Sequence, residues 1–164
     1  RTHPHARLQR WWPASQMQGM GAFAEPGDDV QVHAYTARVR PDGHGIWAEH
    51  GKLVPFFLEY DTGTERLSML VDKISAYHQL AAVTRRVWPV LFWLHSTNRE
   101  RHLHHHLTDA RIQIPVATAA RDHTAQAGKS PAEAVWWPHR HPGGLLRLAD
   151  LAGTVARSGN AEAA

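Results

Sequence analysis

Hydrophobic positions follow two different periods along the chain, and each period predicts one kind of element. Alternating or continuous apolar runs predict strands at residues 30–40, 46–49, 52–60, 87–95, 111–119 and, as an edge, 135–137. Apolar residues three or four positions apart predict helices at residues 1–18, 62 to about 81, 97–110 and 145–151. Because helices alternate with strongly apolar strands, the predicted fold class is α/β, a mixed central β-sheet flanked by helices.

Turn and capping signals mark the ends of several of these elements. His50-Gly51 separates two apolar runs by two residues and predicts a hairpin turn. The segments 62–65 (TGTE) and 97–100 (TNRE) each match a capping box, in which a threonine and a glutamate satisfy the first amides of a helix. We therefore expect a helix to begin at each of these two segments.

The size of the chain bounds its organisation. With 164 residues it can bury one ordinary core, so we expect a single domain over residues 1–152 and a flexible tail over 153–164. Its longest apolar runs are too short to cross a bilayer, no secretion signal is visible, and no cysteine is present. These features predict a cytoplasmic protein without membrane contact, and they exclude disulfides and thiolate metal sites.

The charge of the chain points mildly to an anionic partner. The net charge is only +3 at pH 7, but 14 histidines add positive charge below neutral pH. Most of the basic residues are arginines, whose guanidinium groups make bidentate contacts with phosphate. A polyanion such as DNA is the expected partner class.

Two acidic residues end the most apolar predicted strand. Glu59 and Asp61 are one residue apart, so both side chains leave the same face of the strand. Close carboxylates repel each other unless a cation lies between them, and Mg²⁺ or Mn²⁺ prefers such oxygen ligands. Asp42, in the turn before the hairpin, is the expected third ligand of a metal that would activate water against a phosphodiester. The alternative is an ordinary ion pair with a basic residue across the sheet: Arg38, Arg40 or Lys52.

Three segments together resemble the replication-relaxation family of plasmid and mobile-element proteins. They are RVRPDGHGIW at residues 38–47, FFLEYDTGTERL at 56–67 and KISAYHQL at 73–80. RLQRWW upstream, and PVLFWL and NRE downstream, extend the resemblance over about residues 5–120. The resemblance implies a role in plasmid replication or DNA relaxation, with DNA and other replication or relaxation proteins as partners. Because the family commonly carries an upstream winged-helix region, this chain resembles its C-terminal domain alone.

That family is in turn similar to nucleases of the PD-(D/E)XK type, which implies a restriction-endonuclease-like core. Pro41-Asp42 matches the first half of the signature and Glu59 matches its acid, whereas Asp61 stands where the signature has a lysine. The resemblance implies that Asp42, Glu59 and Asp61 are the metal-binding and catalytic positions. An acid in place of the lysine adds negative charge beside an incoming phosphate, which is unfavourable unless a cation is bound.

A lysine on the following helix is a candidate substitute. Lys73, Arg66 and Tyr77 fall within roughly 40° of one another on a helix of 100° per residue. We therefore expect Lys73 to reach back over the end of the strand as a catalytic residue, and Arg66 to contact DNA. The alternative for Lys73 is a side chain whose aliphatic stem covers the rim of the apolar helix face.

The run HLHHH at residues 102–106 has three interpretations. His102 and His104 match the histidine pair of rolling-circle relaxases, but that chemistry needs both on one strand face, and this run is predicted to be helical. His102 with His105 or His106 has the spacing of a transition-metal clamp on a helix. The preferred interpretation is a solvated helix face opposite an apolar stripe.

Aromatic and basic residues alternate in VWWPHRH at residues 135–141, as they do in proteins that bind single strands. Trp137 and Arg140 are the predicted DNA contacts in this segment. Adjacent tryptophans are equally typical of a structural edge with one ring in the core.

Three functions therefore stay open. The first is a DNA-binding accessory domain with a degenerate nuclease site. The second is an active nickase that depends on Mg²⁺ or Mn²⁺. The third is a protein-interaction module within a replication or transfer complex.

Overall fold

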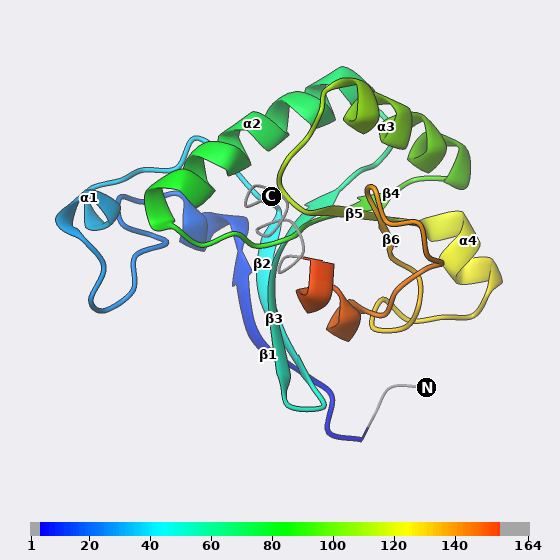
Figure 1. Cartoon of the computed structure of the whole chain (residues 1–164), viewed down its shortest axis with the longest axis horizontal. Coiled ribbons are helices and arrows are strands. Elements are labelled where there is room, and N and C mark those ends of the chain that lie inside the picture. The colour runs from blue at the N-terminus through cyan, green and yellow to red at the C-terminus, as the bar shows by residue number, and fades with distance from the viewer. Residues whose placement is uncertain (1–3, 155–164) are drawn as a thin grey trace, which may run out of the picture.

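The computed structural model describes residues 4–154, which form one mixed sheet with helices on one face and a C-terminal segment on the other (Figure 1). The strands follow chain order across the sheet. They are β1 (Arg7–Pro13), β2 (Gly43–Glu49), β3 (Lys52–Tyr60), β4 (Val90–Leu94), β5 (Val116–Ala120) and β6 (Trp137–Pro138). The helices are α1 (Val30–His33), α2 (Leu67–Thr84), α3 (Thr97–Asp109) and α4 (Arg121–Gln126). The predicted α/β class is confirmed.

Strands β2 and β3 form the predicted hairpin. They pair antiparallel from Gly43 opposite Leu58 to Glu49 opposite Lys52. His50 and Gly51 both have positive φ, 51° and 72°, which is the backbone that a two-residue hairpin turn of type I′ requires. The turn therefore sets the register that brings the start of β2 beside the end of β3.

Strands β3, β4 and β5 are parallel and are connected through α2 and α3. Both helices pack on the same face of the sheet (Figure 1). Leu70, Ile74 and Tyr77 of α2 and Leu103 and Leu107 of α3 are buried there. The 3.6-residue apolar period predicted from the sequence is thus the face by which each helix contacts the sheet.

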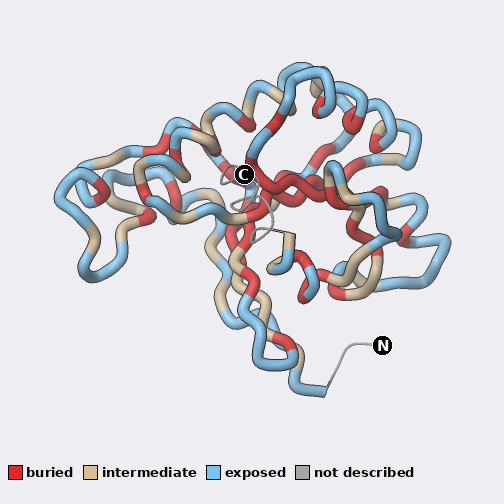
Figure 2. The backbone as a smooth tube through the Cα atoms, viewed as in Figure 1, coloured by how far each residue is buried: buried red, intermediate tan, exposed pale blue. Residues whose placement is uncertain are grey.

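The opposite face of the sheet is covered by residues that follow β5. Val135, Trp136, Leu148 and Leu151 pack on the side chains that alternate with those facing the helices: Val54, Phe56, Leu91, Ala117 and Ala119. Figure 2 shows that the buried positions concentrate along the central strands and on the helix sides that face them. The predicted two-sided cover of the sheet is confirmed, although no long helix provides the second layer within residues 4–154.

The N-terminal predictions were wrong. The segment around RLQRWW, predicted to be helical, is β1, which pairs antiparallel with β2 through Trp11 opposite Gly45 and Pro13 opposite Gly43. Residues 30–40, predicted to be a strand, contain only α1 and then an irregular segment. For β1 the pairing with β2 decides the structure, and in both segments the local pattern is short enough to fit either period.

Smaller differences occur at element ends. The N-cap of α3 is Ser96, whose hydroxyl accepts a hydrogen bond from the Arg99 amide, one residue before the predicted cap. Helix α2 starts at Leu67 after Arg66, so the predicted capping box at 62–65 does not form. The helix predicted at 145–151 is a 3-10 turn at Leu148–Asp150. Of the predicted tail at 153–164, residues 155–164 lie outside the described range. None of the described helices combines the length and apolar character needed to cross a bilayer.

Candidate functional site

Glu59 is the centre of a buried polar cluster at the end of β3. Its side chain is enclosed by the sheet and α2, and the residue is only 2% exposed. The Tyr77 hydroxyl donates to one Glu59 oxygen at 2.5 Å, and the Lys73 ammonium lies 3.4 Å from the other. The same ammonium lies 3.1 Å from a Glu65 oxygen. One helix therefore supplies both groups that compensate for the burial of this acid.

The environment sets opposing influences on the protonation of this cluster. Burial raises the pKa of Glu59, and the Tyr77 hydrogen bond and the Lys73 charge oppose that rise. Burial lowers the pKa of Lys73, but the charges of Glu59 and Glu65 outweigh it and the net shift is upward. Burial, followed by the charge of Glu59, raises the pKa of the Tyr77 hydroxyl well above its usual value. Tyr77 and Lys73 thus remain proton donors toward Glu59.

Asp61 is neutralised by an arginine. The Arg99 guanidinium, in the first turn of α3, binds one Asp61 oxygen through Nε at 2.5 Å and the other through Nη2 at 2.8 Å. Nη2 of Arg99 also donates to the Glu65 carbonyl oxygen. Burial raises the pKa of Asp61, but the Arg99 hydrogen bonds outweigh that effect and the pKa is lowered. The acid in the position of the expected lysine therefore carries a partner charge of its own.

Asp42 lies close enough to Glu59 to influence its charge, but it is exposed to solvent. Its backbone amide donates to the Leu58 carbonyl oxygen at 3.0 Å, which fixes it at the start of β2. Its carboxylate accepts from the Tyr60 amide at 2.7 Å. After burial, the negative charge of Asp42 is a further influence that raises the pKa of Glu59. The structure thus brings Asp42 and Glu59 to one edge of the sheet, as the sequence predicts.

This arrangement leaves no open pair of oxygens on Glu59 or Asp61 for a divalent cation. Both Asp61 oxygens are bound by Arg99, and both Glu59 oxygens contact groups of α2. Across residues 4–154, no group of three or more His, Asp or Glu side chains is placed to hold a metal ion. Binding of Mg²⁺ or Mn²⁺ by Asp42, Glu59 and Asp61 would require these contacts to break, and it stays a prediction.

Lys73 does lie against the strand end, where the sequence placed it, although whether it is catalytic stays a prediction. The predicted alternative ion pairs of the two acids with Arg38, Arg40 or Lys52 do not occur: the partners come from α2 and α3 instead. Arg66 precedes α2 and is exposed. Its contact with DNA stays a prediction.

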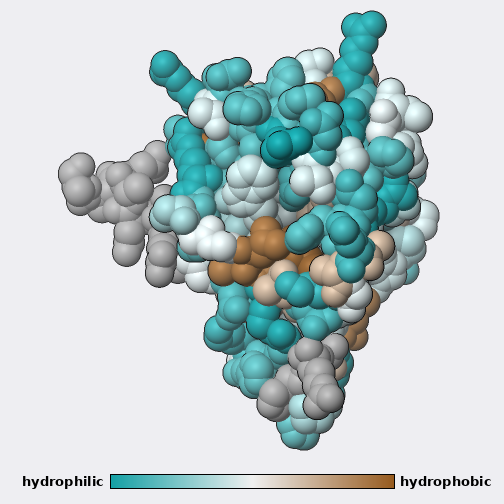
Figure 3. Space-filling view, turned by 90° about the vertical axis from the view of Figure 1, so that its right-hand side faces the viewer, coloured by the Kyte–Doolittle hydropathy of each residue, from teal (hydrophilic) through white to brown (hydrophobic). Residues whose placement is uncertain are grey.

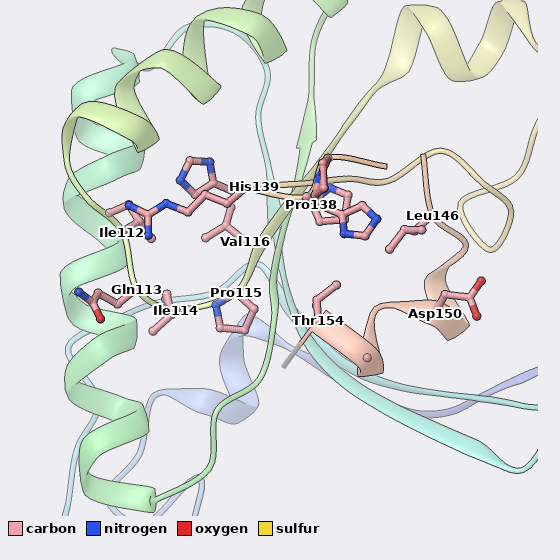
Figure 4. A pocket seen from close by; sticks show the side chains of 14 residues that line it. Ile112, Gln113, Ile114, Pro115, Val116, Pro138, His139, Leu146, Asp150 and Thr154 are labelled. Atoms are coloured by element: carbon pink, nitrogen blue, oxygen red, sulfur yellow. The ribbon is translucent and has the colours of Figure 1, made fainter. Parts of the chain in front are cut away.

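The other predicted DNA contacts lie near the far end of the sheet. Trp137 stacks on the His104 ring, with centroids 3.7 Å apart, and is half-buried. Arg140 is exposed and has a positive φ of 61°. It borders a cavity of about 630 Å³, around which Figure 4 shows side chains from the segment before β5, from β6 and its following loop, and from the C-terminal turn.

The histidine run lies on α3, so the helical prediction is confirmed. Only His104 faces the core, where its Nε2 lies 2.8 Å from the Thr118 hydroxyl, which donates to Glu100 at 2.5 Å. His102, His105 and His106 are exposed. Since His102 and His104 sit on a helix and point to different sides, the geometry of a relaxase histidine pair is absent from this segment.

Sequence reasoning missed Arg99 as a partner of the acids, and Tyr77 as the donor to Glu59. A signal existed for Arg99: the ends of parallel strands meet at one edge of a sheet, so the first turn of the helix after β4 lies beside the end of β3. Arg121, at the start of α4, belongs to the same edge and donates to the Tyr60 hydroxyl at 2.6 Å.

The fold and the site define a mixed α/β domain with an enclosed acid–lysine–tyrosine cluster at the end of its third strand. The chain belongs to the replication-relaxation family, whose model matches residues 1–91. This stretch holds Asp42, Glu59, Asp61 and Lys73 and ends inside β4, earlier than the resemblance predicted. Comparison with curated proteins and with solved structures gives no match. Membership connects the chain with the replication or relaxation of plasmids and mobile elements.

Proposed function

We propose that this chain is a DNA-binding accessory domain for the replication or relaxation of a plasmid or mobile element, with a degenerate site of the PD-(D/E)XK type. The observation that carries this proposal is the internal neutralisation of the two acids at the end of β3. Glu59 is enclosed by Tyr77 and Lys73, and Asp61 is held by Arg99. Acids whose oxygens are bound within the protein leave no open oxygen pair for a metal, and loss of either partner would leave an uncompensated buried charge.

DNA binding is supported by the family and by the arginine-rich surface. Arg66 is the N-cap of α2, one residue after Glu65, and Arg140 lies in the loop after β6. Both are exposed, and arginine is the side chain best suited to phosphate. Because phosphate contacts release counterions, binding should weaken steeply as salt increases.

A nickase is the second function that an observation favours. The Lys73 ammonium lies 3.4 Å from a Glu59 oxygen, with Asp42 just before the neighbouring strand, which supports a lysine from a helix acting in place of the one that the PD-(D/E)XK signature has on the strand. Activity would require the Glu59 carboxylate to leave the Tyr77 hydroxyl and Asp61 to leave Arg99. Those two contacts weigh against this function.

The test combines DNA retention with a supercoiled-plasmid assay. We expect salt-dependent retention of plasmid, and no nicking with Mg²⁺ or Mn²⁺, whether or not EDTA is present. The Arg66→Ala and Arg140→Ala variants should weaken retention, whereas Arg101→Ala, an exposed arginine on α3, is the matched control.

Nicking that requires metal and disappears in Glu59→Ala would establish the nickase instead. A domain that neither retains nor nicks DNA would leave the protein-interaction module as the remaining function.

A further inference from the structure

The face of the sheet opposite α2 and α3 carries a groove lined by aromatic rings. The aromatic groove, defined by Trp11, Trp47, Tyr60, Trp93 and Trp136, has a volume of about 540 Å³. Its rings come from β1, β2, β3, β4 and the segment after α4, so it crosses much of the sheet. Figure 3, the view onto the side that carries α4, shows a hydrophobic patch amid hydrophilic surroundings.

Two glycines shape this groove. Gly43 and Gly45 lie on the β2 positions that face it, and a β-carbon at Gly43 would overlap the Trp11 ring. A β-carbon at Gly45 would lie 2.5 Å from the Phe56 ring and 3.2 Å from Leu8. The glycines therefore let the Trp11 and Phe56 rings, which both line the groove, lie against the backbone of β2.

The rings remain partly open to solvent. Trp11 is 44% exposed and Tyr60 is 48% exposed, next to Leu8 at 48%. Scattered exposed apolar residues are normal, but a contiguous groove of them marks a binding surface. A ligand that covers this surface must present flat apolar faces of its own.

Positive charge lies at the rim. The Arg121 guanidinium stacks over the Tyr60 ring, 5.0 Å from its centroid, and Lys129 precedes Ser130 on the wall of the groove. Within residues 4–154, neither cation forms a salt bridge with an acid: Arg121 donates to Tyr60, His95 and a carbonyl, and Lys129 to the Ala134 carbonyl oxygen. Glu133, on the same segment, accepts from the Ser130 amide.

We propose that the aromatic groove binds unpaired bases of single-stranded DNA, with Trp11 and Tyr60 as the stacking residues and Arg121 and Lys129 beside the phosphates. This proposal rests on the proposed function, of which it names the ligand. Open aromatic rings beside unopposed cations are the combination by which proteins bind single strands without sequence preference. Tyr60 also connects the groove with the cluster of acids at the end of β3, because its backbone amide donates a hydrogen bond to the Asp42 carboxylate.

The test compares an oligothymidine of about 20 nucleotides, longer than one binding module covers, with a duplex of equal length. Fluorescence anisotropy should show that Trp11→Ala and Tyr60→Ala each weaken single-strand binding by roughly tenfold, as expected for the loss of one stacked base. Duplex binding should stay unchanged. Met69→Ala is the matched control, because Met69 is 51% exposed but lies on α2, on the other side of the sheet.

A second measurement guards against misfolding. Oligothymidine should quench tryptophan emission of the unaltered protein, and Trp11→Phe, which preserves an aromatic ring, should retain binding but show less quenching. Equal binding of oligothymidine by the unaltered protein and both alanine variants would overturn the proposal while leaving duplex binding, and so the accessory function, intact. If neither DNA form is bound, the accessory function itself fails. Self-association of the chain that Trp11→Ala abolishes would assign the groove to a second copy and also overturn the proposal.

Discussion

Arg99 binds both carboxylate oxygens of Asp61 across 38 residues of sequence, and so joins the end of β3 to the first turn of α3. The Asp61 side chain is only 2% exposed and that of Arg99 is 15% exposed. Removing one partner of a buried pair leaves the other charge uncompensated. We expect Arg99→Ala to lower the free energy of unfolding by about 3 kcal/mol, measured by urea denaturation.

The pair can be distinguished from a general packing effect of Arg99. The double variant Asp61→Asn with Arg99→Ala should recover part of the loss, because no charge is then stranded. Arg101→Ala, two residues along α3 and exposed, should change stability by less than about 0.5 kcal/mol. A double variant less stable than Arg99→Ala would contradict this account of the pair.

Tyr77→Phe removes only the hydroxyl that donates to Glu59. Since hydrogen bonds to charged groups contribute more than neutral ones, we expect a loss of about 1.5–3 kcal/mol in the free energy of unfolding. Tyr35→Phe is a matched control: the Tyr35 hydroxyl is also buried but has no hydrogen-bond partner among the described residues. That variant should be neutral or slightly more stable, because an unsatisfied polar group is removed. Equal losses of unfolding free energy in the two variants would show that the hydrogen bond from Tyr77 to Glu59 does not stabilise the fold.

Glu59 and Asp61 should affect the pH dependence of stability with opposite sign. The pKa of Glu59 is raised from its usual 4.5, so its stabilising contribution is complete below 4.5 and is lost as pH rises through the raised pKa. The pKa of Asp61 is lowered from 3.8, so its contribution is present above 3.8 and is lost as pH falls through the lowered pKa. We therefore expect the free energy of unfolding of Glu59→Gln to increase relative to that of the unaltered protein as pH rises above 4.5.

Asp61→Asn provides the contrast for that measurement. The loss in its free energy of unfolding, relative to the unaltered protein, should be smaller at acidic pH than at neutral pH. Urea denaturation at a series of pH values checks both variants. If the stability of Glu59→Gln followed that of the unaltered protein in parallel from acidic to neutral pH, the raised pKa of Glu59 would be disproved.

Gly43→Ala should disturb β1 through Trp11. A β-carbon at Gly43 overlaps the Trp11 ring, and forcing extra atoms into a packed contact costs about 1–3 kcal/mol. In a Trp11→Ala background the same substitution should cost much less, because the ring is gone. Gly144→Ala, where no heavy atom lies within 4 Å of the added carbon, is the control. Equal effects of Gly43→Ala in the two backgrounds would contradict the overlap.

The parts of the fold that the sequence predicted are those with local signals. The hairpin follows from His50-Gly51, whose residues tolerate positive φ, and α2 follows from its long apolar period. Strand β1 was missed because only three of its seven residues are aromatic or aliphatic and they do not alternate clearly, and a bulge between Leu8 and Arg10 breaks the period. Its strand form comes from pairing with β2, which no local pattern contains.

In the candidate site, too, the features with local sequence signals were predicted and those that depend on tertiary packing were not. The closeness of Glu59, Asp61 and Asp42 followed from strand alternation and the hairpin, and the reach of Lys73 followed from helix geometry. The pairing of Asp61 with Arg99 did not, because it depends on where α3 starts relative to the edge of a parallel sheet. The sequence therefore located the acids but not the charge that neutralises one of them.

The layering of this sheet affects how the chain emerges during synthesis. The stretch that matches the family stops at residue 91, inside β4, whereas the residues that cover Phe56 and Leu91 from the far side come from positions 135–151. A nascent chain must therefore leave those apolar side chains exposed to water until residues 135–151 have emerged from the ribosome. A fragment that ends at residue 91 would retain the acids but lose the residues that cover Phe56 and Leu91. Such a fragment should aggregate rather than fold.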